Sequence, residues 1–184
     1  LISEKLDAKL LKEVQGNRLH RDKNNHFQNE SYKLFRPYYE GYQSFRDKAI
    51  TMATALHEQK LDVTVLNIDI QEFYYNIDFN FSSLDGLNIK DEFGLNDLMQ
   101  QIHDTYYEAI QNIQPKDKAS YKQTKFLPIG LVSSSVIANH VLSNFDNDVV
   151  GNLKPEYYSR YVDDMIFVFS NANVDLKSNI LGSK

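Results

Sequence analysis

The chain has 184 residues, a net charge of −5 and no cysteine. This length suits one ordinary domain or most of a larger one, and the missing cysteine excludes disulfide frameworks and thiolate-bound zinc. The acidic balance argues against a generally basic nucleic-acid-binding protein. Because the five histidines never fall at paired ligand spacing, any metal ion must be held by oxygen atoms.

No apolar run approaches the roughly 18 residues of a membrane span, and no signal-peptide pattern opens the chain. These features predict a soluble, cytoplasmic protein without a membrane partner. The chain stops soon after its last apolar strand, which suggests a fragment of a longer protein.

The hydrophobic pattern predicts helices and strands that alternate along the chain. Pro37 and Gly41 indicate a turn, and Asn96 or Asp97 is a plausible helix N-cap. The elements expected in chain order are a helix at 3–15, a strand entering a turn at 32–45, a helix at 45–59, a central strand at 61–70, helices at 96–113 and 133–150, and strands at 156–162 and 165–170. This order predicts an α+β fold, with an antiparallel sheet and helices on one face.

Two adjacent aspartates, Asp163 and Asp164, stand between the last two strands. Burying unpaired carboxylates is expensive, so we expect a two-residue hairpin turn that places both at the rim of the sheet. Asp69 ends the strand at 61–70, and three carboxylates converge if these strands are neighbours. Such an oxygen site suits Mg²⁺, and two ions about 4 Å apart would serve phosphoryl transfer. Two simpler interpretations remain open: Asp favours turns, and Asp69 with Glu72 has the spacing of a capping box.

Three motifs resemble, in the same order, the central motifs of reverse transcriptases. They are "DIQEFY" at 69–74, "LPIGLVSSSVIANHVL" at 127–142 and "YVDD" at 161–164. The resemblance covers roughly residues 30–170 and implies a right-hand polymerase, with an N-terminal helix and fingers segment at 1–60 and a palm at 61–184. The thumb, expected after the hairpin, is missing. The implied activity is RNA-directed DNA polymerase, a nucleotidyltransferase that adds dNTPs to a 3′-hydroxyl and releases pyrophosphate.

The resemblance also implies roles for individual residues. Asp69 and Asp163 would bind two Mg²⁺ ions, for which Mn²⁺ could substitute, with Asp164 beside them and the main-chain carbonyl of Ile70 as a further ligand. Tyr74 would lie under the sugar and exclude a 2′-hydroxyl, although a tyrosine in the core is the alternative. Tyr161 would lie near the primer terminus, or else pack on a helix.

The loop and the N-terminal segment supply the remaining candidates. Gly130 would let the backbone approach template or nucleotide closely, while Ser133 and Ser134 would cap the next helix and face the site. Lys33 and Arg36 would meet the incoming triphosphate, with Arg46 as a weaker candidate. Their alternative is an ordinary solvated surface. Asn139 is expected to have a packing role or to make a buried polar contact.

The chain departs from most of the family at Ile129, where Gln is usual, and at Ser135, where Pro is usual. Losing the Gln amide puts template dependence in doubt. The loop and the stretch "RPYYEGYQSFRDKAI" look more like bacterial abortive-infection and defence-associated reverse transcriptases, which implies an antiviral defence role. The implied partners are dNTPs and an RNA or DNA template and primer, with a non-coding RNA or a second copy of the chain as further candidates. Template-independent or protein-primed synthesis, and a catalytically silent RNA-binding scaffold, are the alternatives.

Overall fold

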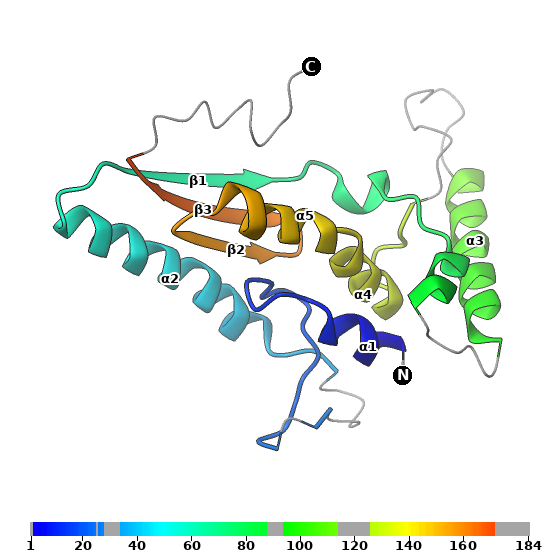
Figure 1. Cartoon of the computed structure of the whole chain (residues 1–184). Helices are drawn as coiled ribbons and strands as arrows, with labels where there is room; N and C mark the ends of the chain where they lie inside the picture. Colours follow the sequence, from blue (N-terminus) through cyan, green and yellow to red (C-terminus); the bar gives the residue numbers. More distant parts are fainter. Residues whose placement is uncertain (1, 25, 28–33, 88–93, 114–125, 172–184) are drawn as a thin grey trace.

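The computed structural model describes residues 2–24, 26–27, 34–87, 94–113 and 126–171. Figure 1 shows a small sheet with helices around it. The elements in chain order are α1 (Ile2–Ala8), α2 (Tyr38–Glu58), β1 (Val63–Asp69), the short 3-10 helices η1 (Phe73–Asn76) and η2 (Phe81–Leu87), α3 (Leu95–Ile113), α4 (Val132–Val141), α5 (Ser143–Asp148), the π-helical turn η3 (Val149–Leu153), β2 (Tyr157–Tyr161) and β3 (Asp164–Ser170).

Three antiparallel strands form the sheet, in the order β1, β3, β2. β3 is central because its apolar run, residues 165–169, is buried on both faces. β1 lies at one edge of the described sheet, and Thr64, Val65 and Asn67 are exposed. The prediction of a central strand at 61–70 is therefore wrong, because β-branched residues fit a half-exposed edge strand as well as a buried one.

Helices cover both faces of the sheet, where the sequence predicted one. Alternate residues of a strand point to opposite faces. On one face, Phe45 and Ala49 of α2 pack against Ile166. On the other, Phe167 packs in a cluster with Val149 of η3 and part of α5. In Figure 1, α2 and α5 accordingly lie on different sides of the strands.

The N-terminal segment departs from its predicted helix after seven residues. Residues 13–17, which we call the strap, run beside β2, and Val14 forms an isolated parallel bridge with Arg160. The backbone N–H of Arg160 donates to the Glu13 carbonyl at 3.0 Å, and Gln15 N–H donates to the Arg160 carbonyl at 2.8 Å. The helix predicted over 3–15 is thus wrong in its second half, because Val14 is buried beside β2 and does not continue a helical stripe.

α2 begins at Tyr38, well before the helix predicted from Phe45. Pro37 is the N-cap, with a φ of −54° that suits the start of a helix. Gly41 lies inside α2 and marks no turn. A Cβ at Gly41 would come within 2.9 Å of the Gln15 carbonyl, so this glycine allows the helix to approach the strap.

The helices predicted over 96–113 and 133–150 are present with different ends. α3 begins at Leu95, which places Asn96 and Asp97 inside its first turn and not at its N-cap. The second region forms α4, α5 and η3 in succession. Among the described helices, none is both long enough and apolar enough to span a membrane.

Candidate active site

The hairpin between β2 and β3 turns one residue earlier than predicted. Its turn residues are Val162 and Asp163, and Asp164 already belongs to β3, opposite Tyr161. Val162 has a φ of 60°, a left-handed conformation that β-branched residues rarely adopt. The predicted turn at Asp163 and Asp164 is wrong because Asp164 keeps its place in the ladder, between β1 and β2.

The structure brings three aspartates to the hairpin end of the sheet. Asp69, the last residue of β1, lies directly opposite Asp164, and Asp163 stands in the adjoining turn. Asp69 is exposed, and the other two are partly exposed. Within the described part of the chain, no ion pair joins any of them to a basic side chain.

The charges of these aspartates disfavour one another. Burial raises the pKa of Asp163 above its ordinary value, and the charge of Asp69 raises it further. Burial likewise raises the pKa of Asp164, with added contributions from Asp163 and Asp69. A cation at this edge would relieve the repulsion.

A divalent metal fits the donor atoms but has no ready-made cage. Among the described residues, no group of three His, Asp or Glu side chains is already arranged to hold a metal ion. Asp69, Asp163 and Asp164 nevertheless supply only hard carboxylate oxygens, at an edge open to water. Mg²⁺ needs one or two carboxylates and completes its shell with water and substrate phosphates. The donor chemistry therefore fits Mg²⁺ or Mn²⁺.

Tyr74, the candidate sugar gate, lies next to the aspartates. It belongs to η1 and is partly buried against the core. Burial raises the pKa of its hydroxyl and the charge of Asp163 raises it further, while the neighbouring side chains of Ser135 and Asn17 lower it. Ser135 and Asn17 were not predicted as contacts. The departure from the family's usual Pro at Ser135 was the only signal, and Asn17 carried none.

The loop before α4 is joined to η1. Leu127 N–H donates to the Tyr74 carbonyl at 3.0 Å. Gly130 has a φ of 97°, and a Cβ built there would meet nothing within 4 Å, so the backbone conformation and not crowding within the chain requires glycine. Ile129, in place of the usual Gln, is 53% exposed.

The two serines predicted to cap α4 do not cap it. α4 begins at Val132, and its N-cap residue makes no side-chain cap. Ser133 instead lies 2.9 Å from Nε2 of His103 on α3, and Ser134 is buried. The family loop therefore turns Ser135, not Ser133 or Ser134, toward the candidate site.

Tyr161 packs on a helix, which is one of the two roles that the sequence left open. Its ring packs edge-on against Tyr42 of α2, with centroids 5.4 Å apart, and its hydroxyl lies 3.5 Å from the Tyr38 carbonyl. It also lies opposite Asp164 in the ladder. Tyr161 is thus packed against α2 and is the β2 neighbour of Asp164 in the ladder.

The remaining candidates are more scattered. Ile70 directly follows β1 and packs between two core clusters. Arg36 is exposed, and Arg46 forms a surface pair with Asp47 at 3.1 Å. No described contact brings either arginine to the aspartates. Lys33 lies outside the described residues.

A buried polar network lies behind the hairpin, and its charged members were not predicted. Arg160 and Asp146, 0% and 1% exposed, form a two-pronged pair with N–O distances of 2.8 and 2.6 Å. The Tyr158 hydroxyl donates to Asp146 at 2.6 Å. A signal existed: Asp146 falls at helical spacing between Leu142 and Val149, on an otherwise apolar face. Buried charges are rarely unpaired, so such a residue requires a partner.

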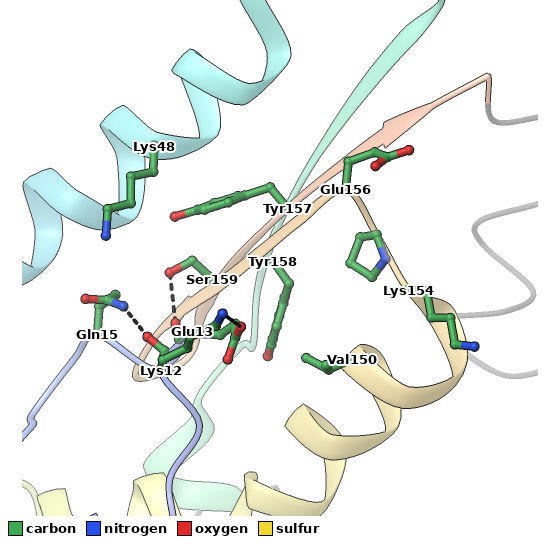
Figure 2. Close-up of a pocket in the computed structure, with 11 residues that line it drawn as sticks. Lys12, Glu13, Gln15, Lys48, Val150, Lys154, Glu156, Tyr157, Tyr158 and Ser159 are labelled. Carbon is green, nitrogen blue, oxygen red and sulfur yellow. Dashed lines mark hydrogen bonds and ion pairs between the residues drawn. The ribbon is translucent and has the colours of Figure 1, made fainter. Parts of the chain in front are cut away.

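A groove of about 480 Å³ opens along the outer edge of β2. Figure 2 shows Lys12, Lys48 and Lys154 around it, and the Ser159 hydroxyl bonded to the Glu13 carbonyl of the strap. None of the three aspartates lines this groove. The carboxylate edge and the groove are therefore separate features.

An α+β domain whose central hairpin and neighbouring strand gather aspartates has the architecture of a polymerase palm. A family model described as reverse transcriptase (RNA-dependent DNA polymerase) matches residues 4–181, and the chain therefore belongs to the reverse transcriptase family. No curated protein sequence matches the chain. The family match supports a nucleotidyltransferase of the reverse-transcriptase type. The substrates expected for this class are dNTPs and a nucleic-acid template and primer.

Proposed function

We propose that this domain catalyses attack of a 3′-hydroxyl on the α-phosphate of a dNTP, which forms a phosphodiester bond and releases pyrophosphate. The observation that carries this proposal is the alignment of Asp69 opposite Asp164, with Asp163 in the adjoining turn and no basic side chain of the described residues paired with them. Mutually repelling carboxylates at an open edge destabilise the free protein, and a bound cation would relieve that repulsion.

The residues around this edge have separate roles in the proposal. Asp69, Asp163 and the main-chain carbonyl of Ile70 would hold two Mg²⁺ ions, with Asp164 beside them. Bound Mg²⁺ would supply charge neutralisation for the phosphates and activation of the attacking hydroxyl. Tyr74 would block a 2′-hydroxyl from the position of the sugar.

We further propose that Tyr161 supports the primer end, and that Gly130 admits template or nucleotide close to the backbone. Lys33 and Arg36 would contact the triphosphate. The domain division at residue 60 and a role in anti-phage defence rest on the sequence resemblance, and a cytoplasmic location rests on the sequence pattern alone. A non-coding RNA or a second copy of the chain would be additional partners.

The second candidate is template-independent or protein-primed synthesis, and one observation favours it. Ile129 replaces the Gln whose amide could hydrogen-bond near the template, and it is more than half exposed. A silent RNA-binding scaffold is less well supported, because a scaffold gains nothing from three uncompensated aspartates.

The direct test is dNTP incorporation by the full-length protein and by Asp163→Ala. We expect incorporation to fall about 1000-fold, equivalent to about 4 kcal/mol in the barrier, with the fold retained. Asp62→Ala is the matched control, since Asp62 is an exposed aspartate just before the other end of β1. Incorporation by Asp163→Ala at the wild-type rate would exclude the metal assignment.

Metal dependence and template dependence are tested with the same protein. Incorporation should require Mg²⁺ or Mn²⁺, and Ca²⁺, with its looser geometry, should bind without supporting turnover. Undiminished incorporation in EDTA would contradict the proposal. Sequencing the DNA product made with and without added RNA then separates copying from template-independent synthesis.

A further inference from the structure

Arg160 connects the buried network to the hairpin turn. Its Nη1 donates to the Val162 carbonyl at 2.7 Å and to Oδ1 of Asn139 at 3.1 Å. Its Nε and Nη2 are held by Asp146, and Nη2 also reaches the Asn139 carbonyl at 3.3 Å. All three nitrogens of the guanidinium are therefore hydrogen-bonded, and Nη1 is the one that holds the turn.

The strap clamps the same turn from a second side. Asn139 Nδ2 donates to the Gly16 carbonyl at 2.8 Å, which ties the strap to the network. A Cβ on Gly16 would lie 2.7 Å from the Val162 nitrogen and 2.8 Å from its Cγ2. The backbone at Gly16 thus packs directly against Val162.

These contacts explain how the turn keeps its strained residue. A β-branched residue at positive φ persists only where its surroundings impose that conformation. Val162 is held by Arg160 through its carbonyl and by Gly16 through van der Waals contact. Because the turn has only two residues, the conformation of Val162 fixes where Asp163 stands, while Asp164 is fixed independently by the ladder.

We propose that Arg160, locked by Asp146 and Asn139, is a positioning residue that sets the Asp163 carboxylate against Asp69. This inference rests on the proposed function, since it gives the network a purpose at the metal-binding edge. Arg160 touches no substrate in this account. It acts through the carbonyl of Val162.

The test must separate positioning from simple support of the fold. Arg160→Met alone would leave Asp146 buried and unpaired, so the informative protein is the triple variant Arg160→Met, Asp146→Leu, Tyr158→Phe. Replacing a buried ion pair with apolar residues of similar volume is often neutral for stability. The triple variant should therefore fold, yet it lacks the donor to Val162.

Two measurements start from the folded protein prepared without metal. Mn²⁺ affinity is measured by electron paramagnetic resonance, and we expect it to weaken about 10- to 100-fold, as when supports of metal ligands are removed. Amide hydrogen exchange at residues 162–164 should accelerate at least about tenfold if the turn loses its tie. The amide of Phe167, in the middle of β3, is the internal reference and should not change.

A second variant perturbs the turn from the side of the strap. Gly16→Ala forces Val162 to move and should also weaken Mn²⁺ binding. Gly151→Ala is its matched control, because a Cβ there meets nothing within 4 Å. Agreement of Gly16→Ala with the triple variant would assign the effect to the turn and not to the lost charges.

The outcomes are distinguishable from failure of the proposed function. Unchanged exchange at residues 162–164, or unchanged Mn²⁺ affinity in a triple variant whose turn has loosened, overturns the positioning role. A wild-type protein that binds no Mn²⁺ contradicts the metal assignment itself. In that case the exchange of residues 162–164 alone decides whether Arg160 positions the turn. If the triple variant does not fold, Gly16→Ala tests by the same two measurements whether the placement of Val162 sets the Mn²⁺ site, and unchanged values overturn the proposal.

Discussion

The two sides of the β2–β3 hairpin differ in whether their charged side chains have partners. On the open side, Asp69, Asp163 and Asp164 face one another without a cationic partner in the described chain. On the closed side, only three residues away in sequence, Arg160 is fully buried and every prong of its guanidinium is hydrogen-bonded. The same short loop therefore joins a cluster of unpaired carboxylates to a network in which the buried charges are paired.

This difference separates residues that support the fold from residues kept for a ligand. A buried polar network stabilises a fold only when its members are all partnered. An open carboxylate cluster adds nothing to the stability of the free protein and is accounted for by a cation that arrives later. Removing a charge should consequently have opposite effects on the two sides.

The largest contrast in stability is expected for single substitutions on the two sides. Arg160→Met leaves the Asp146 carboxylate buried without its partner and should cost about 3–5 kcal/mol of unfolding free energy. Asp163→Asn should cost none. Urea unfolding of both variants measures the contrast, and a loss below about 1 kcal/mol for Arg160→Met would show that the closed side is not a satisfied network.

A smaller effect is expected at Tyr74, on the border between the two sides. If the ring lies under the sugar, Tyr74→Val removes a steric clash, and ribonucleotide incorporation relative to deoxynucleotide incorporation should rise about tenfold or more, about 1.4 kcal/mol. Steady-state incorporation of both sugars measures this ratio. A melting curve for each protein controls for the lost packing. An unchanged ratio in a folded variant would remove Tyr74 from the site.

The smallest effect concerns pH on the open side. Because folding raises the pKa of Asp163 above its ordinary value of 3.8, this group favours the folded state at low pH, and that contribution is lost as the pH rises through the folded pKa. In metal-free buffer, Asp163→Asn should therefore melt higher than wild type near neutral pH. The difference should vanish as the pH falls toward 3.8. A higher melting temperature for wild type at neutral pH would contradict this sign.

Much of the open side could be predicted from the sequence. The hairpin, the strand ending at Asp69 and the closeness of Tyr74 to the site all follow from local patterns and ordered motifs. The turn itself was placed one residue late, since a rule that puts Asp in turns does not anticipate a valine in the left-handed region.

The closed side depends on contacts between distant parts of the chain. Asn139 reaches Gly16, and Arg160 reaches Asp146 and Asn139 from another element. Periodicity alone read the strap as the second half of a helix, because burial against a sheet leaves the same apolar residues as a helical stripe. Such pairings need tertiary structure, which overrides local propensity.

The central claim, that the open side is a divalent metal site, is tested most directly by anomalous diffraction. Crystals of the full-length protein would be grown with Mn²⁺ and a non-hydrolysable dNTP analogue. We predict anomalous density within ligating distance of Asp69 and Asp163, which disappears in Asp163→Asn. Bound nucleotide with no such density at these aspartates would contradict the account.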